Sequence, residues 1–230
     1  MKKYEHIFFD LDHTLWDYDT NTSEAIFEIY EYYDFKSLPV GREDFLRQFH
    51  EANTYLWDLY NHGHIDRMYL RNNRFKMIME KLGFDERFVP EDIGEKYLSV
   101  APSKNGLVDG SMDILHYLAD NYQMHIITNG FDDVQYRKME ASGILHFFNK
   151  IITSDNSGFR KPQKEIFLYA MSRAESTFEN SIFIGDNPTT DIAGAISAEI
   201  DVIYYNPHKD PHEYKVTFEI VSLHEIRNLL

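Results

Sequence analysis

The chain has 230 residues, which is enough for one large domain or for a core domain that carries a smaller insert. Hydrophobic residues make up 43% and charged residues 27%, as in ordinary globular proteins, and no apolar run is long enough to span a membrane. The absence of cysteine excludes disulfides and cysteine-bound zinc, and a net charge of −15 argues against a nucleic-acid polymer as partner.

The chain begins with a short polar segment that leads into an apolar run, His6–Phe9, which predicts a strand. Residues 1–6 carry neither the long apolar region nor the cleavage site of a secretion signal, so we expect a cytoplasmic protein. Two carboxylates, Asp10 and Asp12, follow the strand one residue apart. Because like charges so placed repel each other, either the pair lies on a solvated turn or a positive group is bound between the two residues.

Residues 16–98 differ from the rest of the chain, because aromatic and aliphatic residues recur there at helical spacing and no strand is indicated. We therefore predict a helical insert after the first strand, with the core domain formed by 1–15 and 99–230. Three arginines recur at helical spacing in the insert and could face an anionic substrate, although a solvated face paired with nearby acids is the favoured interpretation. They are Arg67, Arg71 and Arg74.

Beyond the insert, short apolar runs alternate with amphipathic stretches. The predicted strands are His125–Ile127, Lys150–Thr153, Ser181–Ile184 and Val202–Tyr205. The predicted helices are Ser111–Asn121, Asp133–Ser142, Lys164–Ala174 and Thr190–Ala198. This alternation predicts an α/β fold, in which a doubly wound, Rossmann-like parallel sheet is covered by helices on both faces.

Polar motifs follow four of the predicted strands. Taken singly, each has a structural explanation as a helix cap, a turn or a surface lysine. Together, however, they stand at the strand ends, where doubly wound sheets bind their ligands. In chain order they contain Asp10, Asp12 and Thr14; Thr128 and Asn129; Lys161; and Asp186 and Asp191.

These four motifs, in this order, resemble those of the haloacid dehalogenase-like hydrolase superfamily, and the insert has the position of the helical cap in that superfamily. The resemblance implies a Mg²⁺ ion bound by Asp10, by the backbone carbonyl of Asp12 and by Asp186. It also implies that Asp10 is a nucleophile that forms an aspartyl-phosphate and that Asp12 is the general acid and base. Thr128, Asn129 and Lys161 would then bind the phosphate.

The same resemblance gives supporting roles to Thr14 and Asp191. Asp191 either supports the metal site or holds Lys161, and a helix cap is its structural alternative. Two residues depart from the superfamily pattern, since His13 and Glu199 stand where glycine is usual. A side chain in a left-handed helix cap costs about 1 kcal/mol of stability, so Glu199 affects stability and leaves the motifs intact.

Within the superfamily, the runs around Thr128, Lys161 and Asp186 look most like those of bacterial pyrimidine nucleotidases. We therefore predict a Mg²⁺-dependent phosphomonoester hydrolase that acts on a small phosphorylated substrate, a nucleoside 5′-monophosphate with a pyrimidine preferred. A sugar-phosphate phosphatase and a phosphomutase are alternatives, and a non-catalytic protein that binds a phosphorylated ligand is an alternative of another class. No membrane partner is expected, and the sequence does not decide between monomer and dimer.

Overall fold

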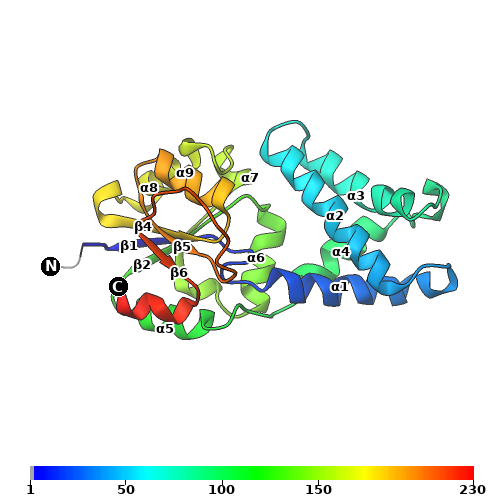
Figure 1. Ribbon diagram of the computed structural model, residues 1–230, viewed down its shortest axis with the longest axis horizontal. Helices are drawn as coiled ribbons and strands as arrows, with labels where there is room; N and C mark the ends of the chain where they lie inside the picture. Colours follow the sequence, from blue (N-terminus) through cyan, green and yellow to red (C-terminus); the bar gives the residue numbers. More distant parts are fainter. Residues whose placement is uncertain (1–2) are drawn as a thin grey trace. The chain divides into compact units, whose positions relative to one another are not determined.

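A computed structural model describes residues 3–230 of the protein (Figure 1). Residues Asp19–Lys104 form one compact unit, the helical unit, and the other described residues form a second, the core unit. The strands are β1 (His6–Phe9), β2 (Gln123–Thr128), β3 (Phe148–Thr153), β4 (Ser181–Gly185), β5 (Asp201–Tyr205) and β6 (Phe218–Ile220). The α-helices are α1 (Tyr18–Tyr32), α2 (Arg42–Asn61), α3 (Arg67–Lys81), α4 (Ile93–Val100), α5 (Ser111–Ala119), α6 (Asp132–Ala141), α7 (Ser154–Ser157), α8 (Lys164–Ala174) and α9 (Ala193–Ser197).

The core unit is built on a six-stranded sheet in the order β3-β2-β1-β4-β5-β6. Every neighbouring pair of strands is parallel. The chain moves outward from β1 to β3 and then returns to the other side of β1 with β4, so the strand order reverses between β1 and β4. Ligands of doubly wound sheets bind at such a reversal, beyond the carboxyl ends of the strands. The predicted doubly wound parallel sheet is confirmed.

Alternate residues of each strand point to opposite faces of the sheet, and both faces are buried. Ile7 and Phe9 of β1 pack with residues of α5, α6 and the 3₁₀-helix Leu223–Asn228, whereas Phe8 packs with residues of α8 and α9. These strand residues are fully buried, and each such side chain contributes about 1.5–3 kcal/mol through removal from water. The two apolar layers thus fix the sheet, and with it the position of the strand ends.

A two-stranded ribbon in the core unit holds together the two points at which the chain leaves for the helical unit and returns from it. Trp16 forms an antiparallel bridge with Leu107. The backbone N–H of Asp17 donates to the carbonyl of Gly106 over 3.1 Å, and the N–H of Val108 donates to the carbonyl of Leu15 over 2.9 Å. The departure and return of the chain are therefore neighbours in space.

The helical unit contains α1 to α4 around its own apolar cluster, which includes Phe45, Phe49 and Phe75. The solvated face favoured for its arginines is wrong for Arg74, which is only 5% exposed. Its guanidinium lies 4.9 Å from the ring centroid of Tyr97, so an aromatic face takes the place of water around this cation. Within residues 3–230, no helix combines the length and the apolar character needed to cross a bilayer.

Strand β6 and two residues with positive φ bear on what the sequence predicts. The strand β6 was not predicted, because it has only three residues and its central residue, Glu219, is exposed. Glu199 has a φ of 60° and His13 a φ of 66°, so both residues lie in the left-handed region that favours glycine. The left-handed cap expected at Glu199 is confirmed.

Candidate active site

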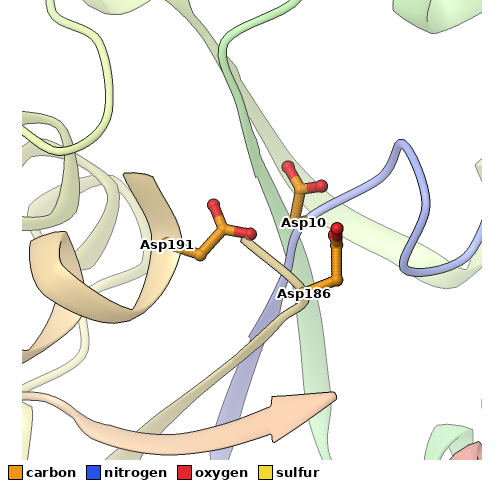
Figure 2. A group of neighbouring side chains, drawn as sticks. All are labelled: Asp10, Asp186 and Asp191. Carbon is orange, nitrogen blue, oxygen red and sulfur yellow. The ribbon is translucent and has the colours of Figure 1, made fainter. Parts of the chain in front are cut away.

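Three carboxylates meet where β1 and β4 end. Asp10 follows β1 directly, is 7% exposed, and its backbone N–H donates to the carbonyl of Ile184 in β4 over 2.9 Å. Asp186 follows β4, and Asp191 lies in the short π-helix Pro188–Ile192 that comes next in the chain. Oxygens of the three carboxylates all lie within 4.8 Å of one another, and Figure 2 shows the three side chains grouped around one space.

The ammonium group of Lys161 lies among these carboxylates. It forms ion pairs with Asp10 and, over 2.7 Å, with Asp191, and the side chain of Lys161 is 2% exposed. Although burial disfavours the charged form, the two carboxylates raise the pKa of Lys161, so the group remains an ammonium ion at neutral pH.

Asp191 is held in place from two sides. Besides its ion pair with Lys161, it accepts a hydrogen bond from the backbone N–H of Asn187 over 3.1 Å. A Cβ atom on Gly185 would lie 2.5 Å from Oδ2 of Asp191, closer than any side chain tolerates. Glycine at the end of β4 therefore allows Asp191 to approach the strand end.

The group carries more negative than positive charge. Three carboxylates and one ammonium ion leave a net charge of −2 when all are ionised. Burial raises the pKa of Asp10, and Asp191 and Asp186 add to this rise while Lys161 opposes it. Burial, followed by Asp191, likewise raises the pKa of Asp186 to about 6. A buried set of oxygen ligands with this excess charge suits a hard divalent cation such as Mg²⁺.

Thr14 and Thr128 also lie at these strand ends. The hydroxyl of Thr14 donates to Oδ1 of Asp186 over 2.8 Å, which orients that carboxylate. Thr128 is the last residue of β2 and is 2% exposed. Asn129 ties this segment to Lys161, because its side chain donates to the carbonyl of Lys161 over 2.9 Å and accepts from its N–H over 2.7 Å.

Asp12 contacts a second cation, which the sequence analysis missed. The ammonium group of Lys138 in α6 lies 2.5 Å from Oδ1 of Asp12, and the side-chain amide of Gln135 donates to Oδ2 over 2.9 Å. Burial opposes ionisation of Asp12, but Lys138 and then Gln135 outweigh it, so the pKa of this carboxyl group is lowered. Asp12 is therefore a carboxylate at neutral pH.

A signal for these two residues exists in the sequence. Phe131, Gln135, Lys138 and Met139 share one face of the helical stretch, and all four are buried. Polar residues on an otherwise apolar helix face need partners, since burial without hydrogen bonds is costly. The periodicity of 131–139 thus indicated a polar contact, but its partner could be identified only once α6 was placed beside β1 and β2.

His13 lies on the loop after β1 and is exposed. Its ring centroid is 4.5 Å from that of Tyr18. The imidazole that stands here in place of glycine is therefore packed against an aromatic ring of the core unit. The loop accepts His13 and keeps Asp12 and Thr14 on either side of it facing the site.

Comparison with known proteins gives consistent matches. A family model for haloacid dehalogenase-like hydrolases matches residues 4–199. The chain is 30% identical to the HAD-hydrolase YfnB of Bacillus subtilis, over 100% of this chain and 97% of that protein. It is also 30% identical to the pyrimidine 5′-nucleotidase YjjG of Escherichia coli, over 99% of this chain and 98% of that protein.

Two further matches bear on the site. A crystal structure of YfnB bound to magnesium has a TM-score of 0.88 at 29% identity and covers 99% of each chain. A glyceraldehyde 3-phosphate phosphatase of Methanothermobacter thermautotrophicus is 38% identical, but over only 37% of this chain and 38% of that protein. Similarity over the whole length is therefore found with the first two proteins and not with the phosphatase.

Proposed function

Because this chain belongs to the haloacid dehalogenase-like hydrolase family, we propose that it is a Mg²⁺-dependent phosphomonoester hydrolase that acts through an aspartyl-phosphate on Asp10. The observation that carries the proposal is the group of three carboxylates, two buried and one half-buried, that pairs with the ammonium ion of Lys161 and keeps an excess of negative charge, which a divalent cation would balance. Asp12, the second carboxylate of the same loop, lies outside this group and is paired with Lys138, and we assign proton transfer to it.

In the proposed reaction, a carboxylate oxygen of Asp10 attacks the phosphorus atom, and the bond from phosphorus to the leaving oxygen breaks. Asp12, a carboxylate in the free protein, takes up a proton from solvent in the substrate complex and gives it to that leaving oxygen. As a carboxylate it then takes a proton from the water molecule that hydrolyses the aspartyl-phosphate. The proton balance is closed, because Asp12 regains from water the proton that it gave to the leaving group.

The remaining residues bind the phosphoryl group. The hydroxyl of Thr128 and the ammonium group of Lys161 stabilise its developing negative charge. Because both polar atoms of the Asn129 side chain bond to the backbone of Lys161, the contact of Asn129 with phosphate is assigned to its backbone N–H. Mg²⁺, when bound by Asp10, Asp186 and the backbone carbonyl of Asp12, supplies positive charge to the phosphoryl oxygens.

We assign a nucleoside 5′-monophosphate as substrate, with a pyrimidine base preferred. The similarity to YjjG extends over nearly the whole chain, including the helical unit, whereas the similarity to the glyceraldehyde 3-phosphate phosphatase covers about a third of it. In this proposal residues 16–98 act as the cap, which excludes water and contacts the part of the substrate beyond the phosphate. Selectivity then lies in the cap rather than in the catalytic residues.

A substrate panel tests the proposal. We expect Mg²⁺ to support phosphate release from UMP and dTMP with a kcat/KM at least tenfold above that for AMP, glucose 6-phosphate and glyceraldehyde 3-phosphate, and EDTA to abolish all release. A sugar phosphate that exceeds every nucleotide tenfold would overturn the substrate assignment alone. Conversion of glucose 1-phosphate to the 6-phosphate without free phosphate would indicate a phosphomutase. Full activity in EDTA would contradict the role of Mg²⁺.

A further inference from the structure

Helix α6 presents two buried polar side chains to the candidate active site. Gln135 is fully buried and Lys138 is 6% exposed, on a helix face that also carries the buried Phe131 and Met139. Both polar side chains bond to residues with proposed roles in the reaction, namely Asp12 and Thr128. Buried polar groups need hydrogen-bond partners, and the partners of these two side chains are residues with proposed roles, which points to a role in placing them.

Gln135 determines which way the hydroxyl of Thr128 can point. The oxygen of that hydroxyl accepts from the side-chain amide of Gln135 over 2.8 Å and from the backbone N–H of Gly130 over 3.1 Å. A hydroxyl group has two lone pairs and one proton. With both lone pairs used, the group is left as a donor, which is the role required toward a phosphoryl oxygen.

Because Gly130 has no side chain, the side chain of Gln135 can lie against its backbone. A Cβ atom at position 130 would lie 2.3 Å from the side-chain nitrogen of Gln135. That nitrogen cannot move aside without cost, because it donates to both Thr128 and Asp12. The glycine after Thr128 and Asn129 therefore allows Gln135 to reach the strand end, in addition to forming the turn.

Lys138 holds the other oxygen of the Asp12 carboxylate. Gln135 bonds to Oδ2 and Lys138 to Oδ1, so the two α6 residues fix the plane of this group. The ammonium group of Lys138 lies 4.3 Å from the ring centroid of Trp16 and 5.7 Å from that of Tyr18. These aromatic contacts limit the positions open to the lysine, and through it those open to Asp12.

We propose that Gln135 and Lys138 are positioning residues for phosphoryl transfer. Gln135 turns the hydroxyl of Thr128 toward the phosphoryl group, and Lys138 aims the carboxyl group of Asp12 at the leaving oxygen. This inference rests on the proposed function and names two residues that act on the substrate only through Asp12 and Thr128.

Two substrates with different leaving groups separate the two roles. The alkoxide released from UMP needs a proton from Asp12, whereas p-nitrophenolate leaves from p-nitrophenyl phosphate without one. The quantity to measure is kcat/KM, which reports the steps up to transfer of the phosphoryl group to Asp10. Lys138→Met should lower it roughly 10- to 100-fold for UMP, and at most about threefold for p-nitrophenyl phosphate.

Gln135→Met should show a different pattern, because charge on the phosphoryl oxygens develops with either substrate. We expect a loss of about tenfold for p-nitrophenyl phosphate, less than the 10²- to 10³-fold that follows removal of a hydrogen-bond donor itself, and a loss at least as large for UMP, because Gln135 also bonds to Asp12. Lys138→Arg keeps the cation, so its loss in kcat/KM for UMP, on a logarithmic scale, should be at most half of the loss seen in Lys138→Met. Arg137→Met removes an exposed cation from the same helix and should leave both values within twofold.

Circular dichroism and the thermal midpoint establish that each variant is folded. If Lys138→Met does not fold, Lys138→Gln replaces it, and if Gln135→Met does not fold, Gln135→Leu replaces it. Equal losses on the two substrates in the Lys138 variant would overturn its role in aiming Asp12. A Gln135 variant within threefold of wild type would overturn the role at Thr128. Wild-type enzyme that hydrolyses neither substrate would instead overturn the proposed function, and this inference with it.

Discussion

Buried polar groups are charged at the carboxyl end of the parallel sheet and neutral at its amino end, although His6 and Asp10 are only four residues apart. At the carboxyl end, the buried groups are charged and carry an excess of negative charge. At the amino end, Nδ1 of His6 and Nε2 of His125 lie 3.1 Å apart, and both residues are buried. Burial, with smaller contributions from His6 and Lys150, lowers the pKa of His125 to about 3, so this pair is neutral at pH 7.

The difference shows what a sheet interior tolerates. Water stabilises charges far better than an apolar interior does, so buried groups become neutral unless an opposite charge is supplied. At the amino end burial outweighs the effect of Glu5 on His6 and acts together with Lys150 on His125, and the two imidazoles share a hydrogen bond. At the carboxyl end the uncompensated charge costs stability in the free protein and is retained where a cation and a phosphate are proposed to bind. The following four changes test this contrast.

The largest effect is expected for Asp10→Asn. Loss of the proposed nucleophile should reduce kcat by about 10³-fold or more, while removal of one negative charge from the group should leave the thermal midpoint unchanged or raise it. Phosphate release and thermal unfolding of the metal-free protein provide the two measurements. His125→Asn is the matched change at the other end and should lower the midpoint while kcat is retained. Retained kcat in the Asp10 variant would contradict the mechanism.

Mg²⁺ should stabilise the folded protein through the carboxyl end alone. At a concentration one hundred times its dissociation constant, a ligand that binds only the folded state adds about 2.7 kcal/mol to the free energy of unfolding. We expect this gain in urea unfolding of the wild type and its loss in Asp186→Asn. Sodium chloride at matched ionic strength is the control, and an equal gain in the variant would show that Asp186 is not a ligand.

The two ends should respond to pH with opposite sign in EDTA. Between about pH 6.5 and pH 3 the unfolded chain binds a proton at His125 that the folded protein does not, so stability falls with falling pH, by at most about 1.4 kcal/mol per unit. Asp186, with a pKa raised to about 6, binds a proton only in the folded state between about pH 4 and pH 6. Its contribution to the free energy of unfolding is therefore lost as pH rises through this range.

Urea unfolding at pH 7 and pH 5 separates these effects. The wild type should lose more stability than His125→Gln on going to pH 5, whereas Asp186→Asn should lose more than the wild type, because it no longer gains from the protonated carboxyl group. Equal pH dependence of the wild type and His125→Gln would show that His125 is not held neutral by the fold.

The smallest effect is expected for Glu199→Gly, just before β5 at the amino end. Relief of a left-handed residue with a φ of 60° should raise the free energy of unfolding by about 1 kcal/mol and leave kcat/KM unchanged. Urea unfolding provides the measurement. Glu179→Gly, exposed in a 3₁₀-helix, is the control and should bring no gain. A change in kcat/KM at Glu199 would show that the amino end influences the site.

The sequence was sufficient for the features that depend on local pattern. Strand ends could be located from apolar runs such as His6–Phe9, and the parallel order then requires the residues that follow, such as Asp10 and Asp186, to be neighbours. Features that depend on how a helix packs could not be derived in this way. The helical periodicity places Gln135 and Lys138 on an apolar face, but Asp12 and Thr128 are identified as their partners only once α6 packs against the sheet. The roles of the site residues remain predictions, which the variants above test.

The ribbon formed by Trp16 and Leu107 has a consequence for how the protein can change over evolution. Because the ribbon joins the points at which the chain leaves the core unit and returns to it, Asp19–Lys104 is a long loop whose ends are already closed. The entropy of closing a loop grows only slowly with its length, so residues can be gained or lost within this segment at little cost to the sheet. If the helical unit selects the substrate, as proposed, substrate choice can change without a change in the folding of the core unit.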